Sequence, residues 1–136
     1  MSPKILVVDD DESNRTLLGL VLERAGYDVL LADDGRSALN FDEEPISHAF
    51  IDMHLPDMPG TAVIQTIRQR HPQAFIVIAT MDDNRDTIAA AYAAEADMFL
   101  VKPYDIARLV QLLPQTQRGQ RWIMDRLGLR VYYPNN

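Results

Sequence analysis

The stretch ILVVDDD, residues 5–11, joins four apolar residues directly to three aspartates. The apolar part contains β-branched residues and no alternating polar ones, which favours a strand covered on both faces. Aspartates placed side by side repel one another, by about 4 kcal/mol for two carboxylates about 4 Å apart at a surface-like dielectric of about 20. The stretch therefore predicts a buried strand whose end either leaves the aspartates in water or uses them to hold a positive group.

The chain continues as short apolar runs that alternate with helical patterns. Strands are expected at 5–8, 27–32, 47–52, 75–79 and 97–101, and helices at 12–25, 35–41, 61–70, 84–95 and 105–113. Five strand–helix units in succession predict an α/β domain over residues 1–113, with a parallel sheet covered by helices on both faces. Ligands of such sheets bind beyond the carboxyl ends of the strands.

Composition and charge exclude several classes of protein. The 136 residues are 47% hydrophobic and contain no cysteine, which excludes a disulfide framework and thiolate metal sites. The formal net charge of −7 argues against direct binding of nucleic acid. Since no run approaches the length of a membrane span and no apolar signal segment follows Met1, we expect a cytoplasmic protein without a membrane partner.

Polar residues stand at the ends of four of the expected strands. Asp9 and Asp10 end the first strand, Asp52 the third, Thr80 the fourth and Lys102 the fifth. Parallel strands bring these ends to one edge of the sheet, so the five side chains should converge. Carboxylates suit Mg²⁺, and an aspartate beside it can attack phosphorus. A hydroxyl and an ammonium can then hold the phosphoryl oxygens.

Four motifs resemble the receiver domain of two-component response regulators over residues 4–113. They are ILVVDDD (5–11), IDMHLPDMPG (51–60), IVIAT (76–80) and FLVKPY (99–104), in the family's order and at similar spacings. The resemblance implies a doubly wound, flavodoxin-like sheet of five parallel strands in the order 2-1-3-4-5. It also implies that a sensor histidine kinase or phosphotransfer protein donates a phosphoryl group, with Mg²⁺ as cofactor, and that an unidentified protein target receives the signal.

The resemblance also implies a role for each matching residue. The phosphoacceptor is Asp52, the metal ligands are Asp9, Asp10, Asp52 and the backbone carbonyl of His54, the phosphoryl contacts are Thr80 and Lys102, and the switch residues are Thr80 and Phe99. The lysine is usually followed by a cis proline, here Pro103. Met81 departs from the family, which usually has a small residue there; its long side chain either narrows access to Asp52 or points to solvent.

Simpler interpretations and other classes remain open at this point. Asp11 is expected to cap a helix, Phe99 is an ordinary core aromatic at rest, and His48 and His71 are expected at the surface. The alternative function is a degenerate receiver that acts only as a phosphorylation-independent scaffold. An aspartyl phosphatase that turns over outside substrates is disfavoured, because it needs an aspartate at the position of His54.

Residues 114–136 are expected to form a C-terminal extension, too short for a separate output domain. A helix is expected at 115–127, with Trp122 on its apolar side and Gly128 as its cap, followed by a strand at 129–133. The extension holds four arginines and one aspartate, a net of +3, whereas residues 1–113 carry −10. We expect the extension to dock on its own acidic domain; a homodimer contact or a partner-binding appendage are the alternatives.

Overall fold

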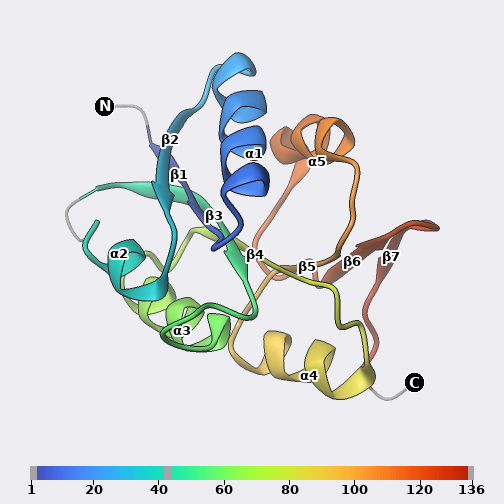
Figure 1. Cartoon of the computed structure of the whole chain (residues 1–136). Coiled ribbons are helices and arrows are strands. Elements are labelled where there is room, and N and C mark those ends of the chain that lie inside the picture. Colours follow the sequence, from blue (N-terminus) through green and yellow to red (C-terminus); the bar gives the residue numbers. More distant parts are fainter. Residues whose placement is uncertain (1–2, 42–43, 135–136) are drawn as a thin grey trace.

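The computed structural model describes residues 3–41 and 44–134 as one sheet flanked by helices (Figure 1). The sheet has seven strands in the order β2-β1-β3-β4-β5-β6-β7. The strands are β1 Lys4–Val8, β2 Asp28–Ala32, β3 Ile46–Asp52, β4 Phe75–Thr80, β5 Met98–Val101, β6 Trp122–Asp125 and β7 Gly128–Val131. The helices are α1 Glu12–Arg24, α2 Gly35–Leu39, α3 Gly60–Arg70, α4 Arg85–Ala93, α5 Ile106–Leu112 and the 3₁₀ turn η1 Leu113–Gln115.

The first five strands confirm the predicted parallel sheet and its order 2-1-3-4-5. Helices α1 and α5 cover one face, and α2, α3 and α4 cover the other (Figure 1). Alternate residues of β1 point to opposite faces: Ile5 and Val7 pack on the α1–α5 side, whereas Leu6 and Val8 pack on the other side. This two-sided burial explains why the strand is apolar at every position after Lys4.

Short polar side chains fix where four of the helices begin. Asp11 accepts a hydrogen bond from Asn14 N at 3.0 Å, as expected for a cap of α1. Asp34, Asn84 and Asp105 cap α2, α4 and α5 in the same way. At the other end of α1, Gly26 takes a φ of +99°, which glycine adopts without strain. The loops at the carboxyl ends of the strands are therefore short and well defined.

The predicted helix at 115–127 is wrong. Only the η1 turn, Leu113–Gln115, precedes a hairpin in which β6 runs parallel to β5 and antiparallel to β7. Trp122, Ile123 and Met124 pair with Met98, Phe99 and Leu100 across the β5–β6 ladder. Gly128, predicted as a helix cap, instead opens β7 with a φ of +126°. Residues 122–125 form a strand because they pair with β5, which is distant in sequence, and this pairing outweighs the helix-like spacing of their apolar residues.

The extension is attached to the domain at several points, as expected from its charge. The Arg118 guanidinium lies 3.6 Å from both the Glu95 and the Asp97 carboxylates. Asp97, which is 1% exposed, also accepts a hydrogen bond from Gly119 N at 2.6 Å. No helix of the described residues is both long enough and apolar enough to cross a membrane.

Candidate functional site

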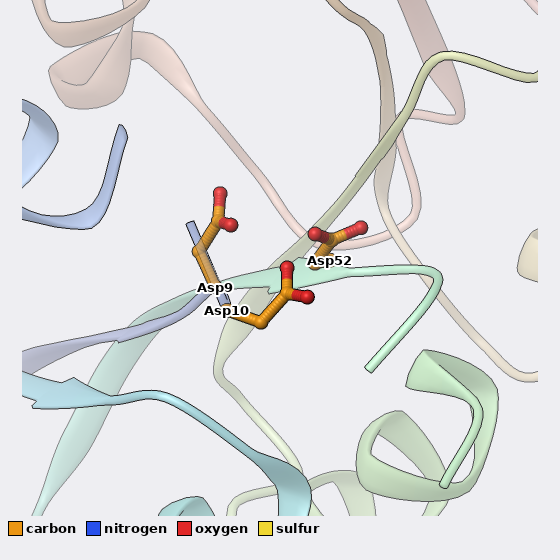
Figure 2. A group of neighbouring side chains, drawn as sticks. All are labelled: Asp9, Asp10 and Asp52. Carbon is orange, nitrogen blue, oxygen red and sulfur yellow. The ribbon is translucent and has the colours of Figure 1, made fainter. Parts of the chain in front are cut away.

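Three carboxylates gather where β1 and β3 end, as the sequence predicts. One oxygen from each of Asp9, Asp10 and Asp52 lies within 4.8 Å of the others (Figure 2). Asp9 and Asp52 are each 8% exposed, whereas Asp10 is exposed. The ladder between β3 and β4 places Asp52 opposite Ala79, so the carboxyl end of β3 lies beside that of β4. The site is a small acidic pocket open to solvent on the Asp10 side.

Lys102 brings a positive charge into this pocket from the end of β5. Its ammonium Nζ lies 3.2 Å from Asp9 Oδ2 and 3.2 Å from Asp52 Oδ2. The Lys102 backbone N–H donates to Thr80 O at 2.9 Å, and this hydrogen bond fixes the position of the lysine backbone beside the end of β4. The peptide bond to Pro103 is cis, as the resemblance implies. One ammonium therefore faces three carboxylates, and the pocket keeps a net negative charge.

The pKa shifts of Asp52 and Lys102 reflect both their burial and their pairing. Burial raises the pKa of Asp52; the Lys102 ammonium and the His54 N–H, which donates to Asp52 at 3.2 Å, oppose the shift without cancelling it. Burial alone would lower the pKa of Lys102, but the Asp52 and Asp9 carboxylates outweigh it and the pKa is raised. The ammonium thus stays charged, while the buried carboxylates remain only partly compensated.

The two residues expected to act as switches lie near the pocket but outside the ion-pair cluster. Thr80 is 2% exposed, and its hydroxyl accepts a hydrogen bond from Asp82 N at 3.1 Å. Phe99 is 0% exposed in the middle of β5, where it packs in the core beneath α4. Thr80 is therefore tied to the loop that leads into α4, and Phe99 is a buried core residue.

The loop between β3 and α3 is held against the acceptor strand and against α2. A Cβ at Gly60 would overlap the carbonyl oxygen of Asp52, so only glycine fits there. Gly60 N also donates to Met53 O at 2.7 Å. On its outer side, the Asp57 carboxylate accepts hydrogen bonds from Gly35 N and Arg36 N, both at 2.9 Å. These contacts fix the backbone around His54.

Sequence reasoning missed three residues that shape the pocket. Arg15 donates to the carbonyl oxygen of Asp9 at 2.7 Å. Tyr104 lies close enough for the Asp9 and Asp52 charges, together with its burial, to raise the pKa of its hydroxyl. Asp57, described above, is the third. Met81 is 78% exposed and lines a hollow of about 210 Å³ together with Lys102 and Tyr104, at the entrance to the pocket.

The donor set fits a hard divalent cation. Carboxylate oxygens at this spacing are typical ligands of Mg²⁺, which binds one or two carboxylates and retains several waters. Because Asp10 is exposed, waters can complete the coordination shell on that side. The described residues that form the pocket offer neither histidine nor cysteine to it, so oxygen ligands prevail.

The fold and the acidic pocket define a class: a flavodoxin-like α/β domain with an aspartate cluster at the carboxyl edge of its sheet. The family model described as the response regulator receiver domain matches residues 5–114, and the chain belongs to this family. Receiver domains are parts of two-component signalling systems. The predicted fold class and family are thus confirmed.

Relatives and solved structures agree. The response regulator protein PilR of Pseudomonas aeruginosa is 37% identical over 116 residues, which is 85% of this chain and 26% of that protein. A CheY-like receiver domain from Methanospirillum hungatei aligns with a TM-score of 0.79 and 26% identity, over 85% of this chain and 93% of the other. The beryllofluoride-activated receiver domain of DrrB, a Thermotoga maritima protein, aligns with a TM-score of 0.78 and 26% identity, over 85% of this chain and 97% of the other. The chain spans about a quarter to a half of the first curated relatives.

Proposed function

We propose that this chain is a phosphoacceptor module of a two-component phosphorelay, phosphorylated on Asp52 and signalling through contacts with other proteins. The observation that carries the proposal is the Lys102 ammonium at 3.2 Å from both Asp9 and Asp52, beside an exposed Asp10. A cluster with three carboxylates and one ammonium can take a divalent cation beside Asp52, and Lys102 can then pair with an anion there. The donor is a sensor histidine kinase or a phosphotransfer protein.

Each residue of the pocket has a defined part in the transfer. The Asp52 carboxylate attacks phosphorus, forms a bond from one oxygen, and the P–N bond of the donor histidine breaks. Lys102 is placed to neutralise a phosphoryl oxygen at this position, and Arg15 holds the backbone of Asp9. Asp9, Asp10, Asp52 and the His54 carbonyl would hold Mg²⁺, which would supply positive charge to offset the repulsion between the carboxylate and the phosphoryl group.

The signal leaves the pocket through Thr80 and Phe99. The Thr80 hydroxyl accepts a hydrogen bond from Asp82 N and can at the same time donate its own hydrogen to a phosphoryl oxygen on Asp52. When Thr80 turns toward that oxygen, it draws the loop before α4 toward β3. Phe99 then changes its packing beneath α4. A partner that prefers the altered surface shifts the population toward it.

Residues 1–113 are proposed as the receiver domain and residues 114–136 as an extension of its sheet. That the receiver module works on its own is also a proposal. The same holds for a cytoplasmic location and for the absence of nucleic-acid or membrane partners. The chain acts as a signalling module with slow chemistry on itself, and not as an enzyme that turns over outside substrates.

Beryllofluoride binding tests the proposal, because this anion imitates a phosphoryl group on a carboxylate. With Mg²⁺, ¹⁹F NMR should show a bound beryllofluoride signal for the wild type and none for Asp52→Asn. Chelation of Mg²⁺ should remove the signal. If the wild type shows no bound signal although Mg²⁺ is present, the chain is the degenerate scaffold and the phosphoacceptor proposal fails.

A further inference from the structure

A groove of about 700 Å³ lies between the start of α4 and the C-terminal hairpin. Its floor is formed by Ile88 of α4 and Ile123 of β6, which are 7% and 3% exposed. Val131 and Tyr133 line it from the hairpin side and are 44% and 63% exposed. The end of β7 lies near the start of α4 in Figure 1. The groove therefore has an apolar floor and an apolar rim that is open to solvent.

The side chains that line the groove carry charges of both signs. Arg85 and Arg130 line it, against one carboxylate, Asp83. Arg130 is paired with Asp125 at 2.6 Å, while Arg85 makes no ion pair with any residue of the described part of the chain. The extension as a whole carries +3 against −10 for residues 1–113. A carboxylate of a ligand seated in the groove can therefore pair with Arg85.

We propose that this groove, defined by α4 and the β6–β7 hairpin, binds a segment of another protein in which carboxylates flank one or two large apolar side chains. The apolar side chains enter between Ile88, Ile123 and Val131, where they leave water. The carboxylates meet Arg85 and Arg130 at the edge of the groove.

Two physical connections join the groove to the phosphorylation site, and this part rests on the proposed function. Asp83 follows Asp82, whose N–H is bonded to the Thr80 hydroxyl at 3.1 Å, so one wall moves with Thr80. Ile123 of the floor pairs with Phe99 across the β5–β6 ladder. We therefore expect phosphorylation to change the affinity of the groove by about fivefold or more.

The test is selection of a displayed library of random 12-residue peptides on the full chain loaded with beryllofluoride and Mg²⁺. The selected peptides should be rich in Asp and Glu around Leu, Phe or Trp. Their affinity should fall at least tenfold in Arg85→Glu and in Val131→Asp, and should be unchanged in Arg126→Glu. Arg126 is the matched control, since it is an exposed arginine of the same hairpin and does not line the groove.

Three results would overturn the inference. They are selection of no binding peptide, selection of peptides without acidic residues, and equal binding to wild type, Arg85→Glu and Val131→Asp. Self-association of the wild type that both variants abolish would assign the groove to a second copy instead. The link to phosphorylation is separate: if ¹⁹F NMR shows beryllofluoride bound but peptide affinity is the same without it, the coupling fails while the proposed function stands.

Discussion

At the scale of single residues, the pocket depends most on Lys102, because its ammonium is the group that separates the carboxylates of Asp9 and Asp52. Replacing it with alanine leaves both carboxylates facing each other and removes the cation from the phosphoryl position. We expect Lys102→Ala to slow phosphorylation by acetyl phosphate by about 10²–10³-fold, the loss typical of removing one charge-stabilising donor.

Magnesium binding by Lys102→Ala shows whether the substitution affects phosphoryl transfer alone or also the ability of the carboxylates to bind the metal. A pocket that loses its ammonium becomes more negative, so the variant should bind Mg²⁺ at least as tightly as the wild type. Calorimetric titration measures this directly. A wild-type rate of phosphorylation in Lys102→Ala would contradict the role given to the lysine.

Asp57 is a second single residue that affects the pocket, although it lies outside it. Its carboxylate joins the loop after β3 to the N–H groups of Gly35 and Arg36, which also lowers its pKa. Asp57→Ala should loosen the backbone around His54 and weaken Mg²⁺ binding, by less than the roughly tenfold typical of groups that orient a metal ligand directly. Asp33→Ala, which removes an exposed carboxylate two residues before Gly35, is the control. Equal Mg²⁺ affinity in both variants would show that the bridge has no such effect.

His48 gives stability a dependence on pH. It was expected at the surface, but it is half-buried in β3, in ring contact with Tyr27 and Phe75. Burial lowers its pKa below the ordinary value of 6.5, so the unfolded chain binds the proton more readily. The free energy of unfolding should therefore fall as pH drops below about 6.5, with a slope of at most about 1.4 kcal/mol per pH unit from this group.

Urea unfolding between pH 7.5 and pH 5.5, a range of about one unit on either side of the free histidine pKa, checks this. His48→Gln should show a smaller loss of stability than the wild type over that range. His71→Gln is the comparison variant. Burial and the Arg70 charge also lower the pKa of His71, but His71 lies at the end of α3 and not in the sheet, so the variant measures how much of the pH dependence comes from the other histidine. An unchanged pH slope in His48→Gln would exclude the buried histidine as its source.

At the scale of elements, the sequence was most informative where burial imposes a pattern. Strands β1 and β4 are apolar except for Lys4 and Thr80 at their ends, because helices cover both faces, and their limits could be predicted within one residue. The prediction for the extension was wrong because the spacing of Trp122, Ile123 and Leu127 fits a helix as well as a strand. Its pairing with β5 is a contact distant in sequence, which no local pattern encodes.

The candidate site shows the same division. Residues directly after a strand, such as Asp52 and Lys102, could be predicted to converge because the strand ends meet at one edge. Asp57 and Arg15 could not be, since an exposed loop aspartate and a helix arginine carry no signal without knowledge of the neighbour they reach. Contacts of this kind depend on how α2 and α1 pack on the sheet.

Helix α4 and the hairpin are joined through Tyr92. Its hydroxyl donates to the carbonyl of Trp122, and its ring stacks on Tyr132 with centroids 4.7 Å apart. Tyr92→Phe keeps the stacking and removes the hydrogen bond, so the free energy of unfolding should fall by about 1 kcal/mol. Denaturant unfolding followed by Trp122 fluorescence measures it. Tyr132→Phe should be nearly neutral, and an equal loss in both variants would contradict this assignment.

At the scale of the whole molecule, the acidic domain and the basic extension form two separate sites on either side of β5. The acidic domain holds the carboxylate cluster, proposed to take Mg²⁺ and a phosphoryl group, at the edge where β1, β3 and β5 end. The basic extension closes the other side of β5 and forms a groove with α4. Since Phe99 of β5 lies between the two, a change of its packing reaches the groove through a neighbouring strand.

The most direct test of the central claim is mass spectrometry of the chain after incubation with acetyl phosphate and Mg²⁺. The account predicts the addition of one phosphoryl group, located on the peptide that contains Asp52, and its absence both in Asp52→Asn and after chelation of Mg²⁺. No addition to the wild type, or the same addition to Asp52→Asn, would contradict it.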